Sequence, residues 1–205
     1  TEYLRKIREF CDEKNILLLF DEVQCGMGRT GFFYAYQGYG IEPDGLSLAK
    51  ALGNGIPIGA FLVKRKYEKV LTPGTHASTF GGTPVACAAA LAVIDTIHNE
   101  NLLANCVKQG HFLVEQLEKL KKRYPCMLEV RGKGLLAGVL FDDSVKVGAK
   151  LLPLLRERGL IALPAGENVL RLLPPLNVKE REIKAAVKII AECLAVLAAA
   201  KQAAT

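Results

Sequence analysis

The chain has 205 residues, half of them apolar and 23% charged, so it is long enough to bury a sizeable core in one domain or in two small ones. Its net charge of +6 is spread along the sequence instead of being gathered in a basic tail, and we expect no nucleic-acid partner. No apolar run is long enough to cross a bilayer, so we expect a globular chain with no membrane partner.

The first predicted element is an amphipathic helix over residues 1–15, where apolar side chains recur at helical spacing. The pattern is already under way at the first residue, and we expect the sequence to be the later part of a longer protein. The apolar run Ile16–Phe20 follows and is typical of a strand buried on both faces of a parallel sheet. Asp21 comes directly after this run.

Two more strands are predicted over residues 45–49 and 58–63, and the first of them ends at Lys50. The stretch between them, GNGIPIG, contains three glycines, which permit positive φ and a close approach of the backbone to a ligand. A surface helix over residues 64–71 and a polar turn over residues 74–82 follow. Strands alternating with short helices predict an α/β layer structure.

The second half of the sequence predicts a different arrangement of helices and strands. Residues 83–100 are Ala-rich and predict a helix with proline in its first turn. A second helix over residues 101–124 is expected to break or bend around Gly110 and to stop at Pro125. The remaining predicted elements are two strands joined by a glycine turn over 127–141, a helix over 144–159, short strands over 160–163 and 168–173, and a terminal helix. We therefore predict an α/β unit over residues 1–100 and a smaller α+β unit over residues 101–205.

Cysteine and histidine spacing argues against disulfides and metals. The six cysteines contain no CxxC pair, and two of them, Cys87 and Cys193, lie in runs that read as buried helix. We predict reduced thiols, as in a cytoplasmic protein. The three histidines are isolated from one another, and no metal site is expected.

Asp21 and Lys50 are the residues with the clearest chemical meaning. Open parallel sheets bind ligands at the carboxyl ends of their strands, and both residues follow predicted strands, although Asp21 alone could be a turn acid and Lys50 alone a solvated lysine. Pyridoxal phosphate enzymes need a lysine amine for the Schiff base and a carboxylate at the pyridine nitrogen. The carboxylate keeps that nitrogen protonated, because a nearby opposite charge favours the charged form.

Three motifs in this order, FDEVQCGMGRTG, SLAKALGNGIPIGA and GTHASTFGG, give the chain a specific resemblance. The whole chain resembles the C-terminal half of the class III (subgroup II) pyridoxal phosphate-dependent aminotransferases of fold type I. The resemblance implies that residues 1–100 are the C-terminal part of a large cofactor-binding domain with a mainly parallel sheet. Residues 101–205 would then form the small α+β C-terminal domain.

The resemblance also implies roles for single residues. Lys50 matches the Schiff-base lysine and Asp21 the acid at the pyridine nitrogen, so both are the expected catalytic residues. The expected cofactor contacts are Asp21, Glu22, Val23, Gln24, Lys50 and Thr79. Thr79 and Ser78 would reach across a homodimer with shared active sites, to the cofactor phosphate and to the substrate. Arg171 matches an arginine that clamps the substrate α-carboxylate through both oxygens, unless it is a surface arginine of the small domain.

The expected reaction transfers the amino group of N2-acetylornithine to 2-oxoglutarate, which becomes glutamate, in arginine biosynthesis. Succinylornithine, ornithine (at its δ-amino group) and 4-aminobutyrate are the alternative donors, and a non-catalytic fragment that retains the dimer interface is the alternative to an enzyme. Two departures from the family pattern stand out. Ala77 replaces a usual glycine, and the family's phosphate loop, ring-stacking aromatic and second substrate arginine have no counterpart within these residues.

Overall fold

The computed structural model describes residues 2–202, and the chain divides into two compact units, Thr1–Leu103 and Ala104–Thr205. Each unit is described by itself. The mixture of helices and sheets agrees with the predicted α/β class. The assignment of the units to a large and a small domain, with the boundary at residue 101, stays a prediction.

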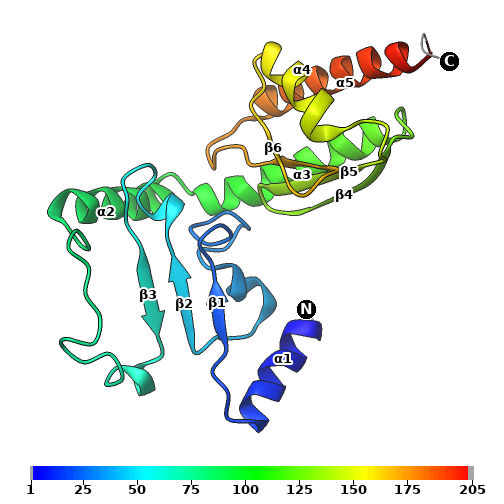
Figure 1. Ribbon diagram of the computed structural model, residues 1–205. Coiled ribbons are helices and arrows are strands. Elements are labelled where there is room, and N and C mark those ends of the chain that lie inside the picture. The colour runs from blue at the N-terminus through cyan, green and yellow to red at the C-terminus, as the bar shows by residue number, and fades with distance from the viewer. Residues whose placement is uncertain (1, 203–205) are drawn as a thin grey trace. The chain divides into compact units, whose positions relative to one another are not determined.

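The first unit consists of a three-stranded sheet, two α-helices and three short 3₁₀ segments. In chain order they are α1 (Glu2–Glu13), β1 (Leu19–Asp21), η1 (Ala35–Tyr39), β2 (Gly45–Leu48), η2 (Lys50–Leu52), β3 (Ala60–Val63), η3 (Arg65–Tyr67) and α2 (Pro84–Asn99). Figure 1 shows the three strands side by side, with α1 beyond β1.

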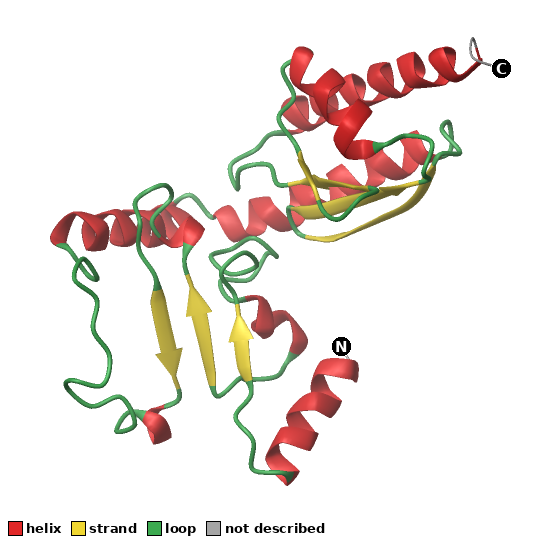
Figure 2. Ribbon diagram, viewed as in Figure 1, coloured by secondary structure: helices red, strands yellow, loops and turns green. Residues whose placement is uncertain are grey.

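The directions of these strands bring two chain segments to one edge of the sheet. β1 and β2 are parallel, with Asp21 opposite Ser47, whereas β3 runs antiparallel to β2, with Ala60 opposite Leu48. The arrowheads in Figure 2 show the two directions. β1 and β2 therefore end at the same edge, the edge at which β3 begins.

Two predictions for the first unit need correction. The first strand is shorter than the run 16–20 and is not buried on both faces, because nothing in residues 2–202 covers Ile16, Leu17 or Leu19, which are each about half exposed. The surface helix predicted over 64–71 is wrong. Only η3 forms there, closed by 3₁₀-type bonds from Tyr67 N–H to the Lys64 carbonyl and from Glu68 N–H to the Arg65 carbonyl.

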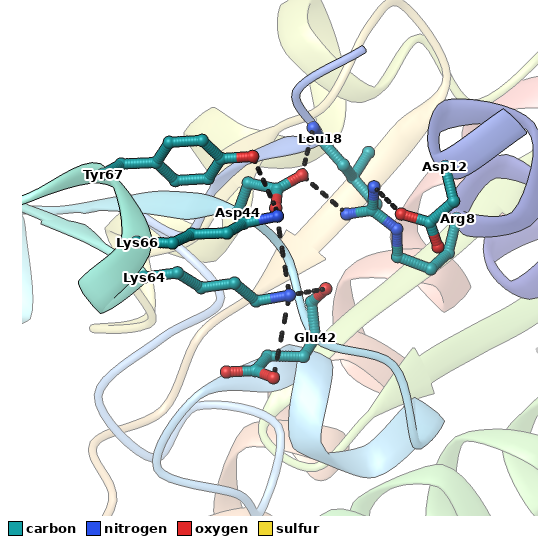
Figure 3. Close-up of polar contacts among 8 residues, drawn as sticks. All are labelled: Arg8, Asp12, Leu18, Glu42, Asp44, Lys64, Lys66 and Tyr67. Atoms are coloured by element: carbon teal, nitrogen blue, oxygen red, sulfur yellow. Dashed lines mark hydrogen bonds and ion pairs between the residues drawn. The ribbon is translucent and has the colours of Figure 1, made fainter. Parts of the chain in front are cut away.

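Asp44 explains why the chain turns tightly after β3. Its carboxylate is buried and accepts hydrogen bonds from the Arg8 guanidinium at 2.8 Å and the Leu18 N–H at 3.0 Å. Lys66 Nζ lies 3.4 Å from the carboxylate, and Figure 3 shows these groups converging on it from α1, from the start of β1 and from η3. The cluster ties the amino ends of β1 and β2 to the carboxyl end of β3, at the edge opposite Asp21.

The second unit carries the larger core. Its elements are α3 (Leu102–Lys121), β4 (Met127–Lys133), β5 (Leu136–Phe141), a π-helical turn η4 (Val147–Leu151), α4 (Leu152–Glu157), β6 (Leu163–Pro164), β7 (Val169–Leu172) and α5 (Glu180–Gln202). The sheet order is β4-β5-β7-β6, all antiparallel. Side chains of the helices and the sheet share one buried cluster, which includes Leu117, Phe141, Leu155, Leu170 and Ile190.

The predicted break of the helix at Gly110 does not occur. α3 continues through this residue, because Gly110 serves a close contact and not a break. A Cβ built on Gly110 would lie 2.3 Å from the carbonyl oxygen of Gly134, in the turn between β4 and β5. The missing side chain lets the helix backbone lie against that turn.

Candidate functional site

Asp21 and Lys50 lie at neighbouring strand ends. Asp21 is the last residue of β1, and Lys50 follows the end of β2 by two residues. Because the two strands are parallel and paired, with adjacent strands about 4.8 Å apart, both residues lie at the same edge of the sheet. Both residues are exposed. The strand reasoning therefore located this edge correctly from the sequence.

Lys50 is held in an unusual backbone conformation. Its φ of 46° lies in the left-handed region, which costs a side-chain-bearing residue roughly 1–2 kcal/mol. The turn that follows supplies compensation, because the Lys50 carbonyl accepts hydrogen bonds from the N–H groups of Gly53 and Asn54 at 3.2 and 3.1 Å. Strain of this kind is concentrated at functional sites.

Gly53 makes this turn possible. A Cβ at this position would lie 2.2 Å from the carbonyl oxygen of Ile56 and 2.7 Å from the Ile58 side chain. The glycine run was expected to serve a ligand, and at Gly53 it serves the close return of the chain on itself. The turn also lies against α2, which contacts η2.

The Asp21 carboxylate has a local hydrogen-bond donor. Val23 N–H donates to Asp21 Oδ1 at 2.9 Å, and the half-buried Cys25 thiol lies 3.7 Å from the Asp21 carbonyl oxygen. Gln24 is half-buried in the same turn. The carboxylate is thus oriented at one oxygen while the side chain stays exposed, which is the state in which a carboxylate can bind a cationic partner.

Glu22, the next residue, has a different environment. It is only 2% exposed, and its carboxylate oxygens accept hydrogen bonds from the backbone N–H groups of Ala35 at 2.7 Å and Tyr36 at 2.9 Å. Glu22 directly follows the last residue of β1 and is buried, whereas Asp21 is exposed. The expected contact of Glu22 with a cofactor stays a prediction.

An aromatic group lies beside Glu22, and the sequence did not single it out. The rings of Tyr34 and Tyr36 stack at 5.7 Å, and that of Phe33 stacks on His98 at 5.6 Å. Burial raises the pKa of both tyrosines, and the nearby acids, Glu22 among them, raise it further. Burial, followed by the charge of Glu22, raises the pKa of the Cys25 thiol in the same way, so this thiol stays protonated at neutral pH.

Thr79 and Ser78 are not among the residues gathered at the strand ends. Both are exposed in the long segment between η3 and α2, which runs beside the sheet in Figure 1. A hydrogen bond from Gly81 N–H to the Ser78 carbonyl at 3.4 Å closes a turn there. Within the described residues, neither is hydrogen-bonded to Asp21 or Lys50.

Arg171 belongs to the second unit. It lies in β7, between Gly138 of β5 and Leu163 of β6, and is half-buried. Its side chain lines a cavity of about 440 Å³ whose other walls are almost entirely apolar, apart from Glu182. A cation in an apolar wall is suited to a carboxylate, because the low local dielectric strengthens the pair.

Other kinds of site are not found in the part of the chain that the structure describes. Residues 2–202 hold no group of three or more His, Cys, Asp or Glu side chains arranged to bind a metal ion. All six cysteines are free thiols. None of the described helices combines the length and the apolar character that a membrane crossing requires.

The chain belongs to the class III aminotransferase family, whose model (Aminotransferase class-III) matches residues 1–194. This confirms the resemblance predicted from the three motifs. Among curated proteins, the chain is 46% identical over 197 residues to the acetylornithine aminotransferase of Synechocystis sp., covering 95% of this chain and 46% of that protein. It is 44% identical over 191 residues to that of Methanocaldococcus jannaschii, covering 93% and 47%.

Solved structures agree on the fold. The acetylornithine aminotransferase of Elizabethkingia anophelis superposes with a TM-score of 0.87 at 39% identity, covering 94% of this chain and 51% of that one. An ornithine aminotransferase of Toxoplasma gondii, with partial occupancy of PLP at its active site, gives 0.91 at 33% identity, covering 98% and 47%. The chain spans about half the length of the relatives it matches.

Proposed function

We propose that the protein to which this chain belongs is a pyridoxal phosphate-dependent aminotransferase that transfers the amino group of N2-acetylornithine to 2-oxoglutarate. Its place would be in arginine biosynthesis, in the cytoplasm. The observation that carries the proposal is the pairing of Asp21 and Lys50 at the ends of adjacent parallel strands, in a chain of the class III family.

The residues at this edge fit pyridoxal phosphate. When bound, this cofactor supplies an aldehyde that takes up the amino group and an aromatic ring that withdraws electrons from the substrate. Lys50 offers an exposed amine for covalent attachment, and once released it can carry a proton as a base. Asp21 offers a carboxylate, oriented by Val23 N–H, that would hold the proton of the ring nitrogen.

Arg171 would bind the substrate α-carboxylate, for which its planar guanidinium is suited. Support comes from its position in the wall of a cavity that is otherwise apolar except for Glu182. The second substrate contact, Ser78, and the phosphate contact, Thr79, would act on the cofactor site of a partner subunit. This part of the proposal is supported by their exposure in the segment between η3 and α2.

A homodimer is part of the same proposal. The segment that carries Thr79, together with α2, exposes large apolar side chains to water, among them Phe80 at 81% and Val85 at 70%. Exposed apolar patches of this kind mark interaction surfaces. A second copy of the chain would bury them. Small-molecule substrates and this second copy are the only partners we propose.

Two alternatives to this function can be tested by experiment. Ornithine aminotransferases are also structural neighbours, at 33–35% identity, whereas the curated acetylornithine enzymes reach 41–46%. This difference favours the acetylated donor over ornithine. A non-catalytic fragment that keeps the dimer interface is the other alternative.

Attachment of the cofactor tests the proposal most directly. The chain, made alone and within the longest polypeptide that its gene encodes, is mixed with pyridoxal phosphate, reduced with borohydride, digested and mapped by mass spectrometry. We expect the adduct on Lys50 and loss of the visible absorption band in Lys50→Ala. The matched control is Lys69→Ala, which removes an exposed lysine of the same unit and should keep the band. A band that survives Lys50→Ala would exclude this lysine as the attachment point.

Substrate identity needs the active protein. Rates with N2-acetylornithine, succinylornithine, ornithine and 4-aminobutyrate as donors to 2-oxoglutarate are compared, and acetylornithine is expected to give the highest kcat/KM. Absence of any reaction with it, in a protein that binds the cofactor, would replace the proposed substrate by one of the others.

A further inference from the structure

Every hydrogen-bonding group of Glu22 is engaged. Its N–H donates to the Ser47 carbonyl at 3.1 Å and its carbonyl accepts the Gly26 N–H at 2.9 Å. Its carboxylate accepts the N–H groups of Ala35 and Tyr36. Burying a carboxylate is costly unless such charge-assisted bonds replace water, and here both oxygens have one. Residue 22 is therefore fixed at its amide, its carbonyl and its side chain.

The surrounding backbone is fitted around this side chain. A Cβ on Gly26 would lie 2.8 Å from the Glu22 carbonyl oxygen and 3.2 Å from Glu22 Oε2. Any larger residue at position 26 would push the turn away from the carboxylate. The two N–H groups that bind the carboxylate belong to residues 13 and 14 positions further along the chain. These hydrogen bonds therefore join two separate stretches of the chain.

Fixing residue 22 fixes the direction of Asp21. The two residues share a peptide bond at the end of β1, and the residue on the other side, Val23, donates its N–H to Asp21 Oδ1. If residue 22 were free to rotate, the Val23 N–H would turn with it and the Asp21 carboxylate would lose this donor.

We propose that Glu22 is a positioning residue, which ties the backbone of residues 35 and 36 to the end of β1 and thereby holds the Asp21 carboxylate in place. Glu22 then acts through Asp21 and does not touch the cofactor. The catalytic importance of an ordered Asp21 rests on the proposed function. The hydrogen bonds that order Asp21 are present in the chain without cofactor.

The test uses Glu22→Gln, which keeps the shape of the side chain but turns one acceptor into a donor that faces a backbone N–H. Glu22→Ala removes both acceptors. The matched control is Glu13→Gln, which removes the same charge from an exposed position at the end of α1. Circular dichroism checks that each variant keeps the secondary structure of the wild type.

Amide hydrogen exchange of the cofactor-free protein is the first readout, followed by NMR. We expect exchange at Ala35 or Tyr36, and at Val23, to be at least about tenfold faster in Glu22→Gln than in the wild type, since each lost bond to a charged acceptor is worth about that factor. Glu13→Gln should exchange at the wild-type rates. Unchanged exchange at Val23 in a folded Glu22→Gln chain would overturn the positioning role, and should Glu22→Gln not fold, the same comparison in Glu22→Ala decides it.

The second readout is the pH midpoint at which the visible band of the bound cofactor changes. Glu22→Gln should move this midpoint in the same direction as Asp21→Asn, by a smaller amount, whereas a merely structural residue would leave it in place. An unmoved midpoint would overturn the proposal. If the longest polypeptide that the gene encodes binds no cofactor at all, the proposed function fails, and the exchange rates at Val23 still decide whether Glu22 holds Asp21.

Discussion

Asp44 and Asp21 lie at opposite edges of the same sheet, and their surroundings suit them to different roles. Asp21 is exposed, with one backbone donor, and is available to a ligand. Asp44 is buried among Arg8, Lys66 and the Leu18 N–H. Burial alone would raise the pKa of Asp44, but the bonds from Leu18 and Arg8 and the charge of Arg8 outweigh it and hold the pKa far below its ordinary value.

This environment makes the stability of the first unit depend on pH. A carboxyl whose pKa is lowered by folding stabilises the folded state above its unfolded pKa of about 3.9, and that contribution is lost as the pH falls through 4 and below. Asp44→Asn should cost about 3 kcal/mol at pH 7, the scale for breaking a buried pair, and about 1 kcal/mol less at pH 3, because the folded carboxylate is still ionised there. The free energy of unfolding in urea, measured at both pH values through amide exchange in β1 and β2, gives the cost of the substitution at each pH.

The control for this prediction is Asp12→Asn. Asp12 pairs with the same arginine at 2.7 Å, but its side chain is 67% exposed. Exposed pairs contribute at most about 1 kcal/mol, so this variant should unfold close to the wild type. Equal losses in the two variants would show that burial of Asp44 is not the source of the effect.

At the scale of elements, the contact between α3 and the β4–β5 turn depends on one missing side chain. Gly110→Ala would bring a Cβ to 2.3 Å from the Gly134 carbonyl, and the backbone atoms there cannot swing aside. We expect a loss of about 2–3 kcal/mol in the free energy of unfolding, even though alanine is the better helix former. Thermal unfolding measures this loss.

Gly148→Ala is the comparison for that prediction. Gly148 lies in the π-helical turn η4, and a Cβ built on it meets nothing within 4 Å. Alanine at such a position should be neutral or slightly stabilising, by up to about 1 kcal/mol. If both variants lose the same stability, helix distortion and not the Gly134 contact is responsible.

The sequence predicted well those features that local patterns encode. The helices α2 and α5, the β4–β5 pair and the presentation of Asp21 and Lys50 at strand ends all follow from apolar runs and turn residues. The break expected at Gly110 is absent, because the glycine allows a close contact with Gly134. The hydrogen bonds of Glu22 were missed because their donors are backbone N–H groups 13 and 14 residues away. Contacts of this kind leave no periodic signal.

At the scale of the molecule, the two units differ in how well they bury apolar side chains. The cluster of buried residues runs from Cys106 to Leu194 and lies entirely in the second unit. The first unit leaves Leu19, Phe61 and Phe80 about half exposed or more. Burial of apolar area is the main source of stability, so the second unit should be the more resistant.

Limited proteolysis checks this expectation. Residues 68–82 are exposed throughout, and chymotrypsin should cut first at Phe80, with trypsin cutting first at Lys69. The fragment over residues 104–202 should outlast the rest of the chain, as followed by mass spectrometry. First cuts within α5 or β5 would contradict the ranking of the two units.

The three-stranded sheet has a consequence for anyone who prepares this chain by itself. β1 and β3 are its outer strands, each with a row of backbone donors and acceptors facing outward beside apolar side chains. Such edge strands allow one copy of the chain to add its own strand to another, so aggregation should increase with protein concentration and after mild heating. Dilute handling, or a lysine introduced in place of Leu19 or Phe61, would limit growth into fibres.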